Sequence, residues 1–249
     1  QENDYAMILG YPGRTNRWMP ANGIEQNVKF AYPAWVEGAK TGMDNMKKFM
    51  TKDATVNLQY ASKYASTANY WKNRQGMIDA LTKAKTAQTK TKEEAKFNAW
   101  ANKAENKAKY GDVIATINNY YAQTNLKARH DNYLTQLLRT ATYGTLPASL
   151  GNGLIAYAKE NEAKRAEMLP RLTSAIDGAY GSLYTPLEKE VLTAQLNLYA
   201  AKAAEYGLAP KVAEMKAANN GDFANDVLKA VTSSIFTSKD AVLAFLKEP

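Results

Sequence analysis

The chain has no cysteine and only one histidine among its 249 residues. The lack of cysteine excludes disulfide bonds, thiolate metal sites and cysteine nucleophiles. The histidine, His130, is predicted in the middle of a helix, where its neighbour Asp131 points about 100° away around the helix axis. A serine triad needs a histidine between a nucleophile and an orienting acid, and the sequence has no Gly-x-Ser-x-Gly turn. We therefore predict no catalytic residue in the chain and expect His130 to be a partly exposed helix residue.

Metal-ligand patterns and long hydrophobic runs are missing too. The sequence has no His-x-x-x-His pair and no Asp-x-Asp-x-Asp loop, so we predict no metal site and no cofactor. No apolar run approaches the roughly 20 residues that cross a bilayer, and we expect no membrane partner. The chain starts with the polar residues Gln1–Asp4 and shows no secretory signal, as a processed chain also would.

The chain is basic, but its basic residues are not gathered into one block. The formal net charge is +8 and the isoelectric point about 9.3. The densest lysine stretch, between Lys83 and Lys96, also contains Glu93 and Glu94, and mixed signs are typical of a solvated helix face. We predict no nucleic-acid partner, although a basic helical bundle that binds nucleic acid stays open as an alternative.

Helical periodicity dominates the chain after about residue 25. Between Asp53 and Lys85, large apolar residues recur three, four or seven positions apart, a stripe that includes Trp71 and predicts that this residue is in the core. Asp53 is a predicted N-cap, and Thr91 with Glu94 forms a predicted capping box. Stripes of this kind, joined by short polar turns, predict an all-α fold, an antiparallel helical bundle.

The first residues do not fit that pattern. Tyr5–Leu9 is mainly apolar and leads into a glycine and proline turn, which predicts a strand. Because a lone strand cannot pair its backbone groups, we expect residues 1–24 to be the end of a β-sheet domain and residues 25–249 to form a helical domain.

Three short runs resemble one family, in family order along nearly the whole chain. The first run is Gly10, Tyr11, Pro12, Gly13, Arg14 and Thr15, continuing to Arg17. The second is Tyr60, Ala61, Ser62, Lys63 and Tyr64, followed by Asn69, Tyr70, Trp71, Lys72 and Gly76. The third is Ser233, Ser234, Ile235 and Phe236, followed by Phe245, Leu246 and Pro249. The chain resembles the bacterial dipeptidyl-peptidases of the VII and XI type and dipeptidyl aminopeptidase BII.

The resemblance implies a serine exopeptidase with a chymotrypsin-like double barrel and a large helical insertion. This chain would be the helical domain, a cap that gates the substrate cleft, with a β-barrel remnant at residues 1–24. In that family an asparagine of the helical domain helps to bind the free N-terminus of the peptide substrate. Asn69 matches that position best, and Asn73, one turn later, is the fallback.

The family's catalytic histidine and aspartate would lie before Gln1, and its serine after Pro249. The resemblance therefore implies that the chain alone is inactive. It also implies that the parent is periplasmic, secreted or at the cell surface. The implied partners are a peptide substrate and the barrel of the same polypeptide, and a second copy of the chain is a candidate partner.

From the residues alone, a non-enzymatic helical adaptor or peptide-binding protein also stays open. Its binding groove would be the methionine-rich stretch Met43–Met50.

Overall fold

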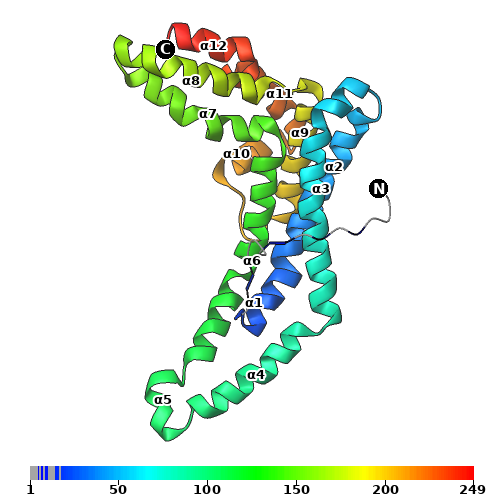
Figure 1. The fold of residues 1–249 in the computed structure, drawn as a ribbon, viewed down its shortest axis with the longest axis vertical. Helices are drawn as coiled ribbons and strands as arrows, with labels where there is room; N and C mark the ends of the chain where they lie inside the picture. Colours follow the sequence, from blue (N-terminus) through cyan, green and yellow to red (C-terminus); the bar gives the residue numbers. More distant parts are fainter. Residues whose placement is uncertain (1–4, 6, 8, 11–14, 17) are drawn as a thin grey trace.

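The computed structural model describes residues 5, 7, 9, 10, 15, 16 and 18–249, and the part that it describes is helical, with no strand (Figure 1). The all-α prediction is confirmed. The α-helices are α1 (Ala21–Gln26), α2 (Tyr32–Met50), α3 (Ala54–Lys83), α4 (Thr86–Ala101), α5 (Ala104–Tyr110), α6 (Val113–Thr140), α7 (Thr142–Lys159), α8 (Glu162–Tyr180), α9 (Thr185–Lys202), α10 (Pro210–Ala218), α11 (Phe223–Ser233) and α12 (Lys239–Lys247). A π-helix, η1 (Asn27–Ala31), joins α1 to α2, and a 3-10 helix, η2 (Ile235–Thr237), precedes α12.

The predicted N-terminal strand has no counterpart at the positions that the structure describes. Tyr5, Met7, Leu9 and Gly10 have no regular secondary structure, and the side chain of Tyr5 is 87% exposed. The other positions of the predicted strand, and the turn residues 11–14, lie outside the described residues. A strand forms only beside a second strand, and the part of the chain in the structure offers none.

The first helix begins at Ala21, and the chain stays helical through η1 and Pro33 into α2. Tyr32 N–H bonds to the Asn27 carbonyl in a π-type turn, and Pro33 follows in the first turn of α2. The wider π turn makes room for the proline ring, and a proline at a helix start loses little because its missing N–H would lack an intrahelical partner there.

The predicted capping box at Thr91 is wrong. Thr91 lies inside α4, where its hydroxyl donates to the Ala87 carbonyl at 3.0 Å. Glu94 accepts the backbone N–H of Ala21 at 2.6 Å and so caps α1, a helix 73 residues away in the chain.

The core lies where α2, α6 and α9 pack together and where α7, α8, α11 and α12 cover one end of them (Figure 1). A second, smaller cluster fixes the first turns of α3 against α2 and α9 through Met46, Val56, Tyr60, Leu187 and Val191. Met43 and Met46 are 6% and 0% exposed. Met43 and Met46 therefore fill the core and cannot line the binding groove of the adaptor hypothesis, whereas Met50 does line a surface pocket.

Beyond the core, α4 and α5 form an arm that leaves α3 and returns through the first half of α6 (Figure 1). Among the described residues of these two helices, only Ala101 is buried. Helix α1 lies between the arm and α6, and Gln26 Nε2 donates to Thr124 Oγ1 at 3.0 Å and to Asn125 Oδ1 at 3.2 Å. These bonds hold α1 against the first half of α6, which is the returning part of the arm.

Two helix boundaries in the second half are set by single residues. Helix α6 ends at Thr140, and Ala141 is extended before α7 begins. The break between α7 and α8 falls at Glu160 and Asn161, because the Asn161 side chain accepts the Lys164 N–H at 3.1 Å and caps α8.

Candidate functional site

The first turns of α3, which carry the Tyr60–Tyr64 run, are fixed by one buried carboxylate. Glu188, 0% exposed, accepts hydrogen bonds from the Tyr60 hydroxyl at 2.9 Å and from Lys63 Nζ at 3.0 Å. It also accepts the backbone N–H and the hydroxyl of Thr142, so it caps α7 from α9. Tyr60 in turn accepts the Tyr184 N–H at 3.0 Å. Burial, and then the Glu188 charge, raise the pKa of Tyr60 far above its ordinary value. The Tyr60–Tyr64 run of the family resemblance therefore helps to hold α3, α7 and α9 together.

Further along α3, Asn69 and Asn73 lie on an exposed face and line the same groove, of about 910 Å³. Its other described walls come from residues before α1, from the α1–α2 segment, from α3 and from the start of α4: Thr15, Asn16, Met19, Ile24, Asn27, Tyr32, Tyr70, Arg74, Met77, Leu81, Thr86 and Lys90. The structure thus brings both candidate asparagines to one concave surface.

The wall of the groove contains a guanidinium stacked on aromatic rings. Arg74 lies 4.7 Å from the ring centre of Tyr32 and 5.7 Å from that of Trp35. These cation–π contacts hold the α3 face against α2. Arg74 was missed at the sequence level, although Tyr32 and Trp35, three residues apart on a predicted helix, are an aromatic pair that could receive a cation.

The groove has no acidic side chain among its described lining residues, whereas Arg74 and Lys90 are cationic. Asn69 and Asn73 each offer an amide oxygen and Tyr70 a hydroxyl oxygen, so this surface has neutral acceptors for an ammonium group. A free ammonium here would need a compensating negative charge from outside the described lining residues.

The remaining residues of the family motifs have separate environments. Of the first run, Tyr11, Pro12, Gly13 and Arg14 lie outside the described residues; Gly10 is exposed, and Thr15 reaches the groove. Tyr70 lines the groove, and Lys72 is exposed. Trp71 is half-buried, not in the core as predicted, and its neighbours Tyr70 and Lys72 on α3 are exposed.

The third run has a structural role at the other end of the molecule, near α11 and α12 (Figure 1). The Ser234 hydroxyl oxygen accepts the Phe236 N–H at 3.1 Å and caps η2. The Phe236 carbonyl accepts the Tyr180 hydroxyl at 2.9 Å, and burial raises the pKa of Tyr180 to about 12.

His130 is buried, with 8% of its surface exposed, which corrects the prediction of a partly exposed residue. Its Nδ1 lies 3.1 Å from Asp131 Oδ1, so the aspartate does reach it from the adjacent position. The Tyr199 hydroxyl accepts the Ala209 N–H at 2.8 Å and lies within hydrogen-bond distance of His130 Nε2, at 2.7 Å. Tyr199 is 0% exposed. This Asp-His-Tyr chain therefore joins α6, α9 and the start of α10, with its hydroxyl closed to any substrate.

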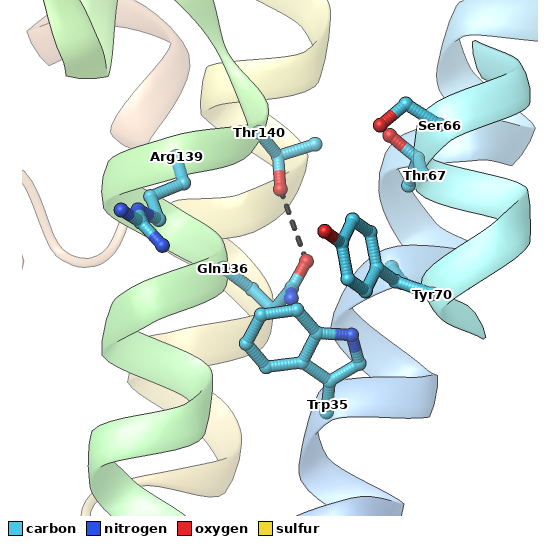
Figure 2. A pocket seen from close by; sticks show the side chains of 8 residues that line it. Trp35, Ser66, Thr67, Tyr70, Gln136, Arg139 and Thr140 are labelled. Atoms are coloured by element: carbon cyan, nitrogen blue, oxygen red, sulfur yellow. Dashed lines mark hydrogen bonds between the residues drawn. The ribbon is translucent and has the colours of Figure 1, made fainter. Parts of the chain in front are cut away.

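A second pocket, of about 340 Å³, adjoins the groove and shares Tyr70 with it. It lies between α2, α3 and α6 (Figure 2). Its lining consists of Trp35, Ala39, Ser66, Thr67, Tyr70, Gln136, Arg139 and Thr140. None of the helices in the described part of the chain combines the length and the hydrophobicity that a membrane span needs.

Comparison with known proteins identifies relatives along the full chain. The model of the family described as Peptidase S46 matches residues 1–249. Dipeptidyl-peptidase 7 of Capnocytophaga gingivalis is 44% identical over 250 residues, which are 100% of this chain and 35% of that protein. Dipeptidyl-peptidase 7 of Porphyromonas gingivalis is 31% identical over 198 residues, 79% of this chain and 26% of that protein. The chain therefore spans about a third or less of the length of these relatives.

Solved structures show the same fold. A crystal structure of Porphyromonas endodontalis DPP11 in complex with the dipeptide Arg-Glu superposes with a TM-score of 0.75 at 22% identity. The match covers 96% of this chain and 34% of that one.

Proposed function

The chain belongs to the peptidase S46 family, and from that membership we propose that it is the helical domain of a serine-type dipeptidyl-peptidase. In this proposal the helices cap the cleft of a β-barrel catalytic domain in the same polypeptide, and the residues before α1, which are most of the predicted segment 1–24, belong to that barrel. The full protein would release dipeptides from the N-terminus of peptides. The chain alone would be inactive, because its single histidine is committed to a buried tyrosine.

The observation that carries the proposal is the groove on α3. Asn69 and Asn73 are exposed, one turn apart, and line one concave surface with Tyr70. Their amide oxygens can accept hydrogen bonds from the terminal ammonium of a peptide. Burying that ammonium without partners costs several kcal/mol, so acceptors at this point would favour substrates with a free N-terminus.

The positive charge of the groove implies that the rest of the polypeptide takes part in binding the terminal ammonium. Because Arg74 and Lys90 are the charged groups among its described lining residues, the negative charge that balances the ammonium would come from the barrel. The cap would then contribute orientation and closure, and the barrel would contribute the charge.

Alanine substitutions of the two asparagines in the full-length protein test the proposal. Asn69→Ala, or Asn73→Ala if the match is one turn later, should lower kcat/KM for free dipeptidyl substrates by roughly ten- to a hundredfold, the value of one or two hydrogen bonds to a charged group. The melting temperature should stay unchanged, since both side chains are exposed. Activity on N-blocked substrates should stay negligible.

Asn57→Ala is the matched control, because Asn57 is exposed on the same helix and does not line the groove. Wild-type kinetics for both Asn69→Ala and Asn73→Ala would contradict an N-terminus site on α3. Hydrolysis of the same substrates by the 249-residue chain alone would contradict the assignment of the catalytic groups to the barrel.

Two further parts of the proposal rest on the family resemblance. We expect the parent protein in the periplasm, at the cell surface or secreted, and we expect a second copy as a candidate partner. Fractionation of the native organism and analytical ultracentrifugation of the full-length protein test them.

A further inference from the structure

The pocket between α2, α3 and α6 is rich in hydrogen-bond donors and has no acidic residue in its lining (Figure 2). We propose that this pocket binds a carboxylate group. The pocket adjoins the asparagine groove and shares Tyr70 with it, but Asn69 and Asn73 do not line it, and the inference does not depend on the proposed peptidase function.

Gln136 supplies a donor from the buried floor of the pocket. The side chain is 5% exposed, and its Oε1 accepts the Thr140 hydroxyl at 3.1 Å. That bond fixes the amide orientation and leaves the Nε2 protons without a hydrogen-bond acceptor among the described residues. Nε2 is not one of the polar atoms closed to solvent, so it is open to the pocket, where a carboxylate oxygen can accept its protons.

Trp35 supplies a second donor without a partner. Its indole Nε1 is closed to solvent and has no acceptor within the described structure. In Figure 2 this nitrogen lies on the side of the ring that faces Tyr70. Tyr70 is 56% exposed, so its ring can turn aside, and a ligand that displaces it meets the indole N–H.

Arg139 supplies the positive charge at the mouth. Arg139 is exposed on α6 and lines the pocket, and in Figure 2 its guanidinium lies on the far side of Gln136 and Thr140 from Tyr70, so this flexible side chain has to turn toward the pocket to reach a ligand. It forms no ion pair with any residue that the structure describes. A guanidinium binds a carboxylate through two parallel N–H bonds, and the pocket then adds neutral donors around it.

Size and charge favour a carboxylate over other ligands. The volume of about 340 Å³ is near the lower end for small-molecule sites. One cation with neutral donors matches a single negative charge, whereas a phosphate dianion would leave charge uncompensated. A cationic ligand would face Arg139 with no acid to balance it.

Calorimetric titration of the full-length protein with N-acetylated ligands tests the proposal. The acetyl group removes the ammonium, so binding does not report on Asn69 or Asn73. N-acetyl-Ala-Ala carries a terminal carboxylate, N-acetyl-glutamic acid α-amide carries only a side-chain carboxylate, and N-acetyl-Ala-Ala-amide carries none. We expect at least one of the two acids to bind at least tenfold more tightly than the amide, and the acid that binds identifies the source of the carboxylate.

Arg139→Gln should weaken binding of that acid at least tenfold, and Ser66→Phe, which fills the rim, should abolish it. Arg171→Gln is the matched control, since Arg171 is an exposed arginine on α8 and should leave the affinity unchanged. Thermal melts confirm that each variant folds. Equal affinity for acid and amide, equal affinity of the Arg139→Gln and Arg171→Gln variants, or displacement by inorganic phosphate at the same concentration would each overturn the proposal.

Discussion

Replacing Glu188 by glutamine should destabilise the fold far more than the loss of one charge on the surface. Glu188 is 0% exposed and accepts four hydrogen bonds, two of them from Thr142. Oε1 receives Tyr60, Lys63 and the Thr142 hydroxyl, and Oε2 receives the Thr142 N–H. In the glutamine variant the amide oxygen can keep the first set, but the N–H₂ group then faces the backbone N–H of Thr142.

The cost follows from these contacts. An unsatisfied buried donor costs about 1–3 kcal/mol, and Lys63 loses its charge partner. Lys63 is 30% exposed and recovers part of that loss from water. We expect a decrease of about 3 kcal/mol in the free energy of unfolding, which for a chain of this size lowers the melting temperature by roughly 6–12 °C.

Glu190→Gln is the control, because it removes the same charge two residues away. Glu190 pairs with Lys48 at 3.0 Å, but both side chains are about half exposed, at 45% and 56%. Such a pair contributes about 0.5 kcal/mol or less. Thermal unfolding by circular dichroism compares the two variants. Melting temperatures of the two variants within about 2 °C of each other would refute the view that Glu188 holds α3, α7 and α9 together.

Two other predictions concern packing and pH. Gly42→Ala should lower the free energy of unfolding by about 1–3 kcal/mol, because an added Cβ would lie 2.3 Å from Thr140 Cγ2. Gly76→Ala, with nothing within 4 Å of an added Cβ, should raise the free energy of unfolding by about 0.5–1 kcal/mol. Equal shifts in the melting temperatures of the two variants would contradict this prediction. Burial would raise the pKa of Asp131, but hydrogen bonds from Lys127 and the adjacent histidine outweigh burial and hold that pKa below its ordinary 3.8. The ionised Asp131 side chain contributes less than about 1 kcal/mol to the free energy of unfolding, because it is half exposed. This contribution is present above pH 3.8 and is lost as the pH falls through the lowered pKa. Asp131→Asn should therefore narrow the stability difference between neutral and acidic pH, and unchanged pH dependence of urea unfolding would contradict it.

Much of the secondary structure could be predicted because its signals are local. Asp53 caps α3 by accepting the Thr55 N–H at 2.7 Å, two residues away. Helix α9 has Pro186 in its first turn, and α10 begins at Pro210. In each case the residues that decide the boundary lie within one turn of it.

The candidate site was predictable only in part. Asn69 was identified from the family resemblance, and the structure places it on an exposed face. The groove itself combines that face with the start of α4 and with residues before α1, and periodicity along one helix carries no information about such neighbours. The pocket around Gln136 and Trp35 depends in the same way on the approach of α2, α3 and α6.

The sequence alone determined the all-α class, most helix positions and the family, since apolar spacing, local caps and short motifs are properties of neighbouring residues. The tertiary structure decided which polar groups are buried and what they bind. Glu94 caps a helix 73 residues away, Glu188 caps one 46 residues away, and His130 is buried against Tyr199. A buried polar group must find a partner wherever the packing brings one, and that partner can lie anywhere along the chain.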